Sequence, residues 1–576
     1  MIQEAELINQ VSRDHLWETN QQIAQWVRNS GTPEEREAFI YVQKKLNEYG
    51  LRTTLLEHPA LVSYPLDSSL TVMDDTGRAI VTYETLGTAY SVSVEGLEAE
   101  VVDIGYGAPE DYAQQDVRGK LVVINGLATP TAVYAAEQAG SIGQIFINAD
   151  HRHYMIVSTI WGTPTPDSAD RIPSTPSLSL TEADGHDLRN RIAEGAVRVH
   201  LQSNVFMDWQ PLPLLVAEVS GTQSNEFVML SGHLDSWEVG AMDNGSANAT
   251  MLEVARLLAL HQEQLYRGLR LCFWSGHSHG RYAGSTWYAD NHWEELHDKC
   301  VAHVNVDSTG ARGAIHYGSF PANRELGPFG EAVINELTGQ TARANRMSRA
   351  GDMSFNGIGI PALFMTVSAV PFNPDNANYV TEAAGKLLGA AMPWWWHTSE
   401  DTMDKVDLDV LVLDTQIYLS TMWRLCNDAI LPMEFVPVIE DIRQTLLALQ
   451  ESVGEHLDLS QASSRADALL THVKTLSGQR DELNQQSGFS EQQLMRINEP
   501  LKALSRLLIP ITYTAAGHFE HDPAWPMPHI PLLKDVPMLA QLDPNSDEYH
   551  FLRTQLVRNL NAVSFALRQA GEIFVS

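Results

Sequence analysis

Histidine and aspartate side chains recur just after apolar segments in the middle of this chain, where they could bind a metal ion. The run "EFVMLSG" is followed by His233 and then by Asp243. The run "VAHVNVDS" contains Asp307, and the segment "WWWHTSEDTMDKVD" supplies His397. Imidazole and carboxylate groups are the ligands that Zn²⁺ and related divalent ions prefer. This set of residues therefore predicts a metal centre.

A third apolar run ends in the turn "SGHSHG", which contains two more histidines, His277 and His279. Histidine can accept and donate protons near neutral pH without any perturbation of its pKa. One imidazole nitrogen cannot both bind a metal ion and carry protons, but two histidines can divide these tasks. We therefore predict that His277 or His279 is the catalytic acid and base, and that His279 is also a candidate metal ligand. Glu238, five residues after His233, is another candidate base.

The segments that carry these residues predict a mostly parallel sheet. Between residues 212 and 430, strand-length apolar runs alternate with helical patterns: "EFVMLSG", "LRLCFWSG", "VAHVNVDS" and "IPALFMTVS", with the helical "NATMLEVARLLALHQ" between the first two. Continuously apolar strands that alternate with helices are typical of a doubly wound α/β sheet covered on both faces. Sites in such sheets form at the carboxyl ends of the strands, so the candidate ligands should meet there.

The flanking regions have other patterns. Thr32, Pro33 and Glu35 predict a helix start, because threonine caps a helix and proline suits its first turn, and Gly50 predicts the helix end. Short strands separated by turn residues follow from about residue 60, and after residue 430 apolar residues recur at helical spacing. A chain of 576 residues is long enough for two to four domains.

Several of these segments together resemble the M28 family of metallopeptidases. They are "GHLDSWEVGAMDNGSANATMLEVARLL", "GDMSFNGIGIPAL" and "HTSEDTMDKVD". More narrowly, the chain resembles the branch that contains glutamate carboxypeptidase II and the transferrin receptor. "GKLVVINGLATPTAVYAAEQAGSIGQIFIN" is similar to part of the protease-associated insert of that branch.

The resemblance implies a zinc-aminopeptidase-like fold in four segments. Residues 1–58 would be N-terminal helices of the catalytic domain, and residues 59–211 a β-rich protease-associated insert domain. Residues 212–430 would be the metallopeptidase-like catalytic domain. Residues 431–576 would be a helical domain of the kind that forms dimers, and by resemblance alone we expect a homodimer.

The resemblance also implies roles for individual residues. His233, Asp243 and Asp307 would hold one metal ion, and Asp243 would bridge to a second ion at His397. Asp235 would orient His233. In the segment that carries His397, Asp401 would support the ligands from behind.

The chain departs from the family at the catalytic pair of adjacent glutamates, one a general base and the other a ligand. Aligned from the preceding strand, the two positions are His277 and Ser278. Aligned backward from "AGST", they are Ser278 and His279, because the turn here has one extra residue. Both alignments lose two carboxylates and gain a histidine, and the sequence does not decide between them.

These observations predict a metal-dependent hydrolase of the M28 peptidase type, acting on a peptide-like or small amide substrate with histidine in place of the usual glutamate base. The cofactor would be a divalent metal, zinc, with one or two ions. Arg281 could bind an acidic group of the substrate, and Trp396 could line the pocket. Two alternatives stay open: a metal-dependent lyase or isomerase, and a non-catalytic binding protein like the transferrin receptor.

The composition limits which binding partners and which cellular compartment we expect for this protein. The formal net charge of −34 disfavours nucleic acid and anionic membrane surfaces, because both require clustered lysine and arginine. The first residues lack an apolar run, and no stretch approaches the length of a membrane span. Three cysteines cannot form a disulfide framework. We therefore expect a cytoplasmic protein with a small-molecule or peptide-like substrate.

Overall fold

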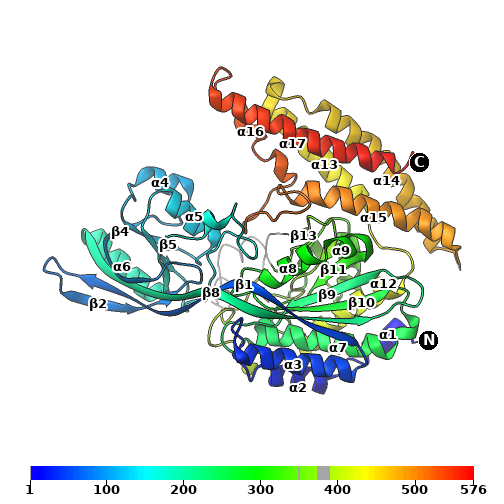
Figure 1. Ribbon diagram of the computed structural model, residues 1–576, viewed down its shortest axis with the longest axis horizontal. Coiled ribbons are helices and arrows are strands. Elements are labelled where there is room, and N and C mark those ends of the chain that lie inside the picture. Colours follow the sequence, from blue (N-terminus) through cyan, green and yellow to red (C-terminus); the bar gives the residue numbers. More distant parts are fainter. Residues whose placement is uncertain (1, 348–350, 373–389, 487, 576) are drawn as a thin grey trace.

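The computed structural model describes residues 2–347, 351–372, 390–486 and 488–575. Figure 1 shows three regions: a β-rich region, a central sheet covered by helices, and a group of long C-terminal helices that lies against one side of the central region. Two long strands, β1 (Arg52–Met73) and β8 (Val197–Val219), run from the β-rich region into the central sheet.

The central sheet is mostly parallel, as predicted. Its strand order is β13-β12-β14-β11-β9-β10-β8. The strands β9 (Phe227–His233), β10 (Gly268–Trp274) and β11 (Cys300–Asn305) run parallel to one another, whereas β10 and β8 are antiparallel. The predicted fold class, an α/β sheet with a C-terminal helical region, is confirmed.

Both faces of this sheet are buried, because successive strand residues point to opposite faces and most of them on each face are apolar. In β10, Leu271 and Phe273 belong to the core beneath the helices α7 (Ala247–Leu260) and α12 (Leu408–Asn427). Cys272 and Trp274 point to the opposite face and pack with Tyr288 of α8 (Ala283–Asn291). Continuous apolar runs in the sequence thus correspond to strands with helices on each side.

The first helices cover the face occupied by α7. The helix α3 (Pro33–Glu48) begins after Thr32, whose hydroxyl accepts the N–H of Glu35, and its end is followed by Gly50 at φ +86°, as predicted. Two shorter helices precede it, α1 (Glu4–Ile8) and α2 (Arg13–Ile23).

One expected strand is much shorter than the sequence suggested. Of the run at 360–368, only β14 (Ala362–Leu363) pairs with β11. Phe364 follows with φ +66°, a left-handed conformation that takes the chain out of the sheet. Phe364 and Val367 are buried in the core although they belong to no strand.

The β-rich region continues the same sheet. Its ladder runs β8-β4-β5-β6-β7-β3, with β4 (Val94–Asp103), β5 (Leu121–Asn125), β6 (Gly143–Ile147) and β7 (Ser177–Leu180). The predicted divisions after residues 58 and 211 fall inside β1 and β8, where His58 is paired with Leu212. The two regions therefore share a continuous pair of strands instead of meeting at loops.

The C-terminal region consists of long helices that pack on one another. They are α13 (Val436–Val453), α14 (Ser460–Asn484), α15 (Glu491–Tyr513) and α17 (Asp547–Glu572). Among the described residues, we find no helix that is both long and apolar enough to cross a membrane.

Shorter elements complete the described chain. They are β2 (Ala79–Glu84), β3 (Leu86–Gly87), α4 (Pro109–Gln114), α5 (Pro130–Gln138), α6 (Glu182–Glu194), α9 (Trp293–Lys299), β12 (Ser319–Ala322), α10 (Gly327–Thr338), β13 (Arg343–Arg346), β15 (Val370–Pro371), β16 (Ala390–Ala391) and α16 (Val536–Leu539).

Candidate metal centre

Three predicted ligands meet at the carboxyl ends of β9 and β11. His233 is the last residue of β9, Asp243 lies in the turn before α7, and Asp307 follows β11. The Nε2 atom of His233 lies 3.2 Å from Oδ1 of Asp243 and 3.7 Å from Oδ2 of Asp307. Parallel strands end at the same edge of the sheet, which brings together residues that are far apart in the sequence.

His397 approaches the same carboxylate from the other side. Its Nε2 atom lies 3.2 Å from Oδ2 of Asp243, and its Nδ1 atom lies 2.7 Å from the carbonyl oxygen of Tyr154. A carbonyl can only accept, so Nδ1 carries the proton and Nε2 is free to act as a ligand. Asp243 thus lies between His233 and His397, with one carboxylate oxygen facing each imidazole.

The donor atoms in this cluster fit a cation. Among the described residues, Nε2 of His233 and Oδ1 of Asp243 are buried without a hydrogen-bond partner. Burial alone raises the pKa of Asp243, but the neighbouring imidazoles of His233 and His397 outweigh it and lower that pKa. A buried carboxylate and imidazole with unpaired atoms are costly to desolvate, and a divalent ion would satisfy both.

Two further aspartates support the ligands. Asp401 accepts the N–H groups of Met242 and Asp243, each at 2.9 Å, and burial raises the pKa of Asp401 to about 7. His233 donates from Nδ1 to the carbonyl oxygen of Asp235 at 2.8 Å, whereas the Asp235 carboxylate is 3.7 Å away. The main chain of Asp235 therefore orients His233 more directly than its side chain does.

The carboxylate of Asp235 also stabilises the turn after β10. Its oxygens accept the N–H of His277 at 3.3 Å and the N–H of Ser278 at 2.8 Å. The turn wraps around this buried carboxylate, and the side chains of His277 and His279 leave it in different directions. His277 faces the cluster, and among the described residues its side chain, with those of His233 and Asp307, forms a group able to hold a metal ion.

The group of His233, His277 and Asp307 does not include His279, whose predicted role as a metal ligand or a catalytic base stays a prediction. His279 is fully buried, and its Nδ1 atom accepts the N–H of Ser30 at 3.2 Å. Nδ1 also lies 3.0 Å from the hydroxyl of Ser30, which donates to Asp235, and Nε2 lies beside the rings of Tyr64 and Trp237 without a hydrogen-bond partner among the described residues. Burial lowers the pKa of His279.

His277 is held by a residue that sequence reasoning did not single out. Its Nδ1 atom lies 2.9 Å from Oδ2 of Asp352, which is almost fully buried. Asp352 lies in the segment "GDMSFNGIGIPAL", whose resemblance to the family was the one available signal. On its other side, the ring of His277 stacks on that of His233, with centroids 3.7 Å apart and planes inclined by 13°.

A pocket of about 250 Å³ opens over the cluster. It is lined by Asp243, Asp307, His277 and His397, and the walls include the two predicted substrate-binding residues, Arg281 and Trp396. Trp396 also stacks on His397 with centroids 3.5 Å apart. Thr129 and Met155 of the β-rich region complete one side, so two regions of the chain form the pocket.

Glu238 does not line the pocket among the described residues, and its predicted role as the base stays a prediction. Its carboxylate accepts the hydroxyl of Tyr154. Its backbone has φ +49°, a conformation that turns the chain away after Trp237.

The two tryptophans just before His397 differ in position, because Trp395 is buried in the core whereas Trp396 lines the pocket.

Comparison with known sequences confirms the family resemblance. Residues 215–422 match the family model described as Peptidase family M28. "Probable glutamate carboxypeptidase VP8" of Zea mays is 23% identical over 570 residues, covering 85% of this chain and 78% of that protein. "Carboxypeptidase Q" of Xenopus laevis is 25% identical over 297 residues, covering 48% of this chain and 60% of that protein.

Comparison with solved structures confirms the fold. An aminopeptidase from Aneurinibacillus sp. strain AM-1 superposes with a TM-score of 0.55 at 20% identity, covering 74% of this chain and 96% of that one. BSAP, a zinc aminopeptidase from Bacillus subtilis, gives a TM-score of 0.52 at 17% identity, with 73% and 96% covered. These structures show the fold, and the match to Peptidase family M28 supports the predicted enzyme class, a metallohydrolase.

Proposed function

Because the central region matches Peptidase family M28, we propose that this chain is a zinc-dependent hydrolase of a peptide-like or small amide substrate, with His277 as its general base. The single observation that carries the choice of base is the position of His277, which stacks on the candidate ligand His233 while Asp352 holds its Nδ1 atom.

One ion would be held by His233, Asp243 and Asp307, whose unpaired buried atoms support this assignment. His397 and the second oxygen of Asp243 would offer a weaker, incomplete position for another ion, because His279 is turned away from it. When bound, the ion would polarise the substrate carbonyl and make water more acidic.

The stacking of the two imidazoles argues that His277 is not a ligand of the same ion as His233. An imidazole nitrogen binds a metal through a lone pair that lies in the plane of its ring. The two rings are stacked with centroids 3.7 Å apart and planes only 13° from parallel, so their planes meet only far from either ring. His233, Asp243 and Asp307 would therefore hold the ion, and His277 would not be a ligand of the same ion as His233.

His277 can instead move protons. Its Nδ1–H donates to Asp352, so Nε2 carries the free lone pair and faces the pocket. In hydrolysis, Nε2 would take a proton from the attacking water and give it to the nitrogen of the leaving amine as the amide bond breaks. Asp352 stabilises the imidazolium that forms between these two transfers.

The test compares the two histidines of the turn. We expect purified protein to contain one tightly bound zinc ion per chain, and His277→Ala to keep it while hydrolysis falls by about 10²- to 10⁴-fold, the usual contribution of a general base. His279→Ala should keep both the ion and most of the activity, with a lower melting temperature. The measurements are elemental analysis, peptide hydrolysis and thermal unfolding.

Other outcomes would contradict this assignment. Loss of the ion in His277→Ala would make His277 a ligand. Two ions in the parent and one in His279→Ala would restore His279 as a ligand. A product without oxygen from ¹⁸O-labelled water would indicate a lyase, and a parent without metal or activity would indicate a binding protein.

We also propose that Arg281 binds an acidic group of the substrate. It is a pocket-lining residue, and among the described residues its guanidinium forms no ion pair; its Nη2 atom donates only to the carbonyl oxygen of Ala524, at 3.3 Å. Its Nε atom is buried without a partner. An arginine with unsatisfied donors beside the reaction site is suited to a carboxylate.

The prediction for Arg281 is a change in selectivity. Arg281→Gln should reduce kcat/KM for a dipeptide ending in glutamate by about tenfold, because a charge-assisted hydrogen bond is lost. The matched dipeptide ending in glutamine should change much less. Equal losses on both substrates would show that Arg281 only supports the structure of the turn.

A further inference from the structure

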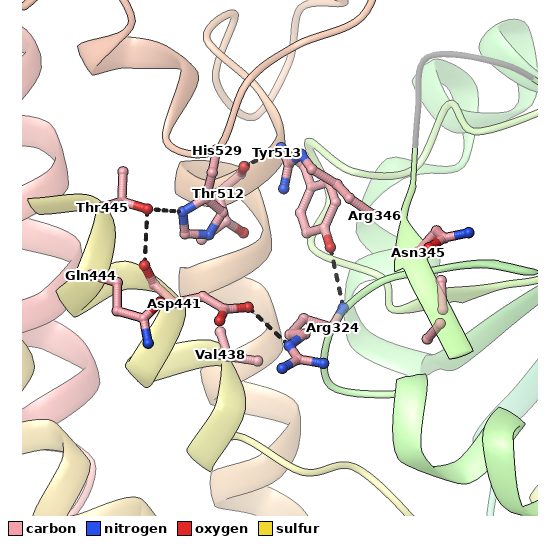
Figure 2. Close-up of a pocket in the computed structure, with 12 residues that line it drawn as sticks. Arg324, Asn345, Arg346, Val438, Asp441, Gln444, Thr445, Thr512, Tyr513 and His529 are labelled. Atoms are coloured by element: carbon pink, nitrogen blue, oxygen red, sulfur yellow. Dashed lines mark hydrogen bonds and ion pairs between the residues drawn. The ribbon is translucent and has the colours of Figure 1, made fainter. Parts of the chain in front are cut away.

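A second cavity, of about 350 Å³, lies between the central region and the C-terminal helices. Figure 2 shows its walls: the end of β12 and the strand β13 on one side, and α13 with the end of α15 on the other. Its polar lining is cationic, with Arg324 and Arg346 against a single carboxylate, that of Asp441. A net positive cavity is unusual in a chain whose formal charge is −34.

Arg346 is fixed without a counter-ion. Its Nη2 atom donates to the carbonyl oxygens of Thr512 at 2.6 Å and Pro528 at 3.1 Å, and its guanidinium lies 4.1 Å from the ring centre of Tyr513. Among the described residues, its Nη1 atom has no hydrogen-bond partner and no carboxylate forms an ion pair with it. Carbonyl oxygens orient this guanidinium but do not neutralise it.

Arg324 lies on the same wall as Arg346, just after the end of β12, and faces Asp441 of α13 across the cavity, as Figure 2 shows. Its Nε atom donates to Asp441 at 2.9 Å, which fixes the plane of the guanidinium. Both terminal nitrogens lack a hydrogen-bond partner among the described residues. The cavity therefore presents two arginines whose outer donors are unused, and such donors match the oxygens of a carboxylate.

A hydrogen-bond acceptor lies in the same cavity. The hydroxyl of Thr445 donates to the carbonyl oxygen of Asp441 at 2.9 Å, so it must accept from Nδ1 of His529, 2.8 Å away. This arrangement leaves Nε2 of His529 with a lone pair and no partner among the described residues. The remaining wall is partly apolar, with Ala322, Ala344 and Val438.

We propose that this cavity binds a small carboxylate that also carries an amino or hydroxyl group, such as an amino acid or a 2-hydroxy acid with an apolar side chain. The carboxylate would lie between Arg324 and Arg346, and the amino or hydroxyl group would donate to His529. The apolar wall would pack against the side chain of the ligand. This site is separate from the metal cluster and does not depend on the function proposed for it.

The test uses four molecules of one carbon skeleton: L-leucine, 2-hydroxy-4-methylpentanoate, 4-methylpentanoate and L-leucinol. We expect the first two to bind the full-length protein with a dissociation constant on the order of 1 mM, ordinary for ligands of this size. 4-Methylpentanoate, which cannot donate to His529, should bind several-fold more weakly. L-Leucinol, which lacks the carboxylate, should not bind detectably. Calorimetry measures the dissociation constants, and ligand-induced shifts in melting temperature are a second measure of binding.

Substitutions in the cavity test whether L-leucine binds there. Arg346→Gln and Arg324→Gln should each weaken L-leucine binding by at least about tenfold. Arg324→Gln is the safer variant, because its side chain bonds only to Asp441. Arg343→Gln, on the same strand but outside the cavity, should bind as the parent does.

Three results would overturn the proposal. One is no binding of any of the four at concentrations well above the expected constant. Another is L-leucine binding that is lost in Arg281→Gln but retained in Arg324→Gln, which would place it in the pocket over the metal cluster. The third is equal binding of inorganic phosphate and L-leucine, which would indicate a general anion site. Loss of binding to L-leucine but not to the hydroxy acid in His529→Gln would show which of the two the site favours.

Discussion

The pocket over β9 and β11 and the cavity between β13 and α13 are both lined by charged groups, but of opposite sign and on different supports. Asp243 is buried, whereas the side chain of Arg324 is 43% exposed. In the first, the acidic groups of Asp243 and Asp307 crowd around imidazoles at the ends of parallel strands. In the second, Arg346 is held by main-chain carbonyls, and Arg324 by one carboxylate on a neighbouring helix. The first arrangement leaves acceptors without a cation, and the second leaves donors without an anion.

This difference shows that local construction, and not overall charge, decides what a cavity can bind. The chain is strongly acidic, yet one of its cavities has a positive lining. In the first pocket, burial makes each unpaired atom costly, so the unsatisfied atoms of His233 and Asp243 indicate a cation. In the second, the guanidinium donors line a partly exposed cavity, and their geometry suits an anion. The following predictions test that reading.

The largest effect should come from the carboxylate shared by the two imidazoles. Asp243→Asn should remove the bound metal and reduce hydrolysis by more than about a hundredfold, since even partners behind a metal ligand are worth about 10- to 100-fold. Elemental analysis measures the metal content, and initial rates measure hydrolysis. Asp208→Asn, an exposed substitution on β8, serves as the control. Full metal content in Asp243→Asn would show that the cluster is not the metal centre.

A smaller loss is expected at Asp352, which positions His277 without touching the substrate. Asp352→Asn should lower kcat by about 10- to 100-fold with little change in KM or metal content, because the imidazolium loses its charged partner. The pH profile of kcat should shift as well. In a His277→Ala background the same substitution should have almost no further effect on the rate. A full additional loss in that background would mean that Asp352 acts independently of His277.

The smallest effect concerns stability in the arginine-lined cavity. Burial lowers the pKa of His529 from 6.5 to about 4, so between these values the unfolded chain binds a proton that the folded chain does not. The stability is fully present above pH 6.5 and is lost as the pH falls toward 4. His529→Gln should reduce this loss, a difference on the order of 1 to 3 °C in melting temperature. The exposed His550→Gln is the control, and identical pH profiles for all three proteins would contradict the prediction.

Much of the fold could be predicted because it depends on local pattern. Thr32 and Gly50 bound the helix α3 through capping and backbone freedom, both of which are properties of a few adjacent residues. The apolar runs indicated buried parallel strands for the same reason. The prediction of a strand over 360–368 was wrong for most of its length. A continuous apolar run fits any buried segment, and the chain leaves the sheet at Phe364.

The positions of the candidate ligands were also predictable, because parallel strands end at one edge of a sheet whatever their loops do. His233, Asp243 and Asp307 could therefore be grouped from the sequence alone, with His397 added through the family resemblance. The roles of His279 and Glu238 stay predictions, although among the described residues neither side chain lines the pocket. The directions of these side chains depend on which buried groups the turn must satisfy, and Asp235 was not known to be one of them.

The sequence by itself determined which residue types are present, which strands are buried, and at which edge of the sheet the polar groups gather, because periodicity and strand direction are local properties. Only the tertiary structure decided that His277 faces the cluster while His279 does not, and that Asp352 supports His277. It alone also brought Arg324 and Arg346 together on one wall of a cavity. These arrangements depend on contacts between residues distant in sequence, whose geometry no local pattern contains.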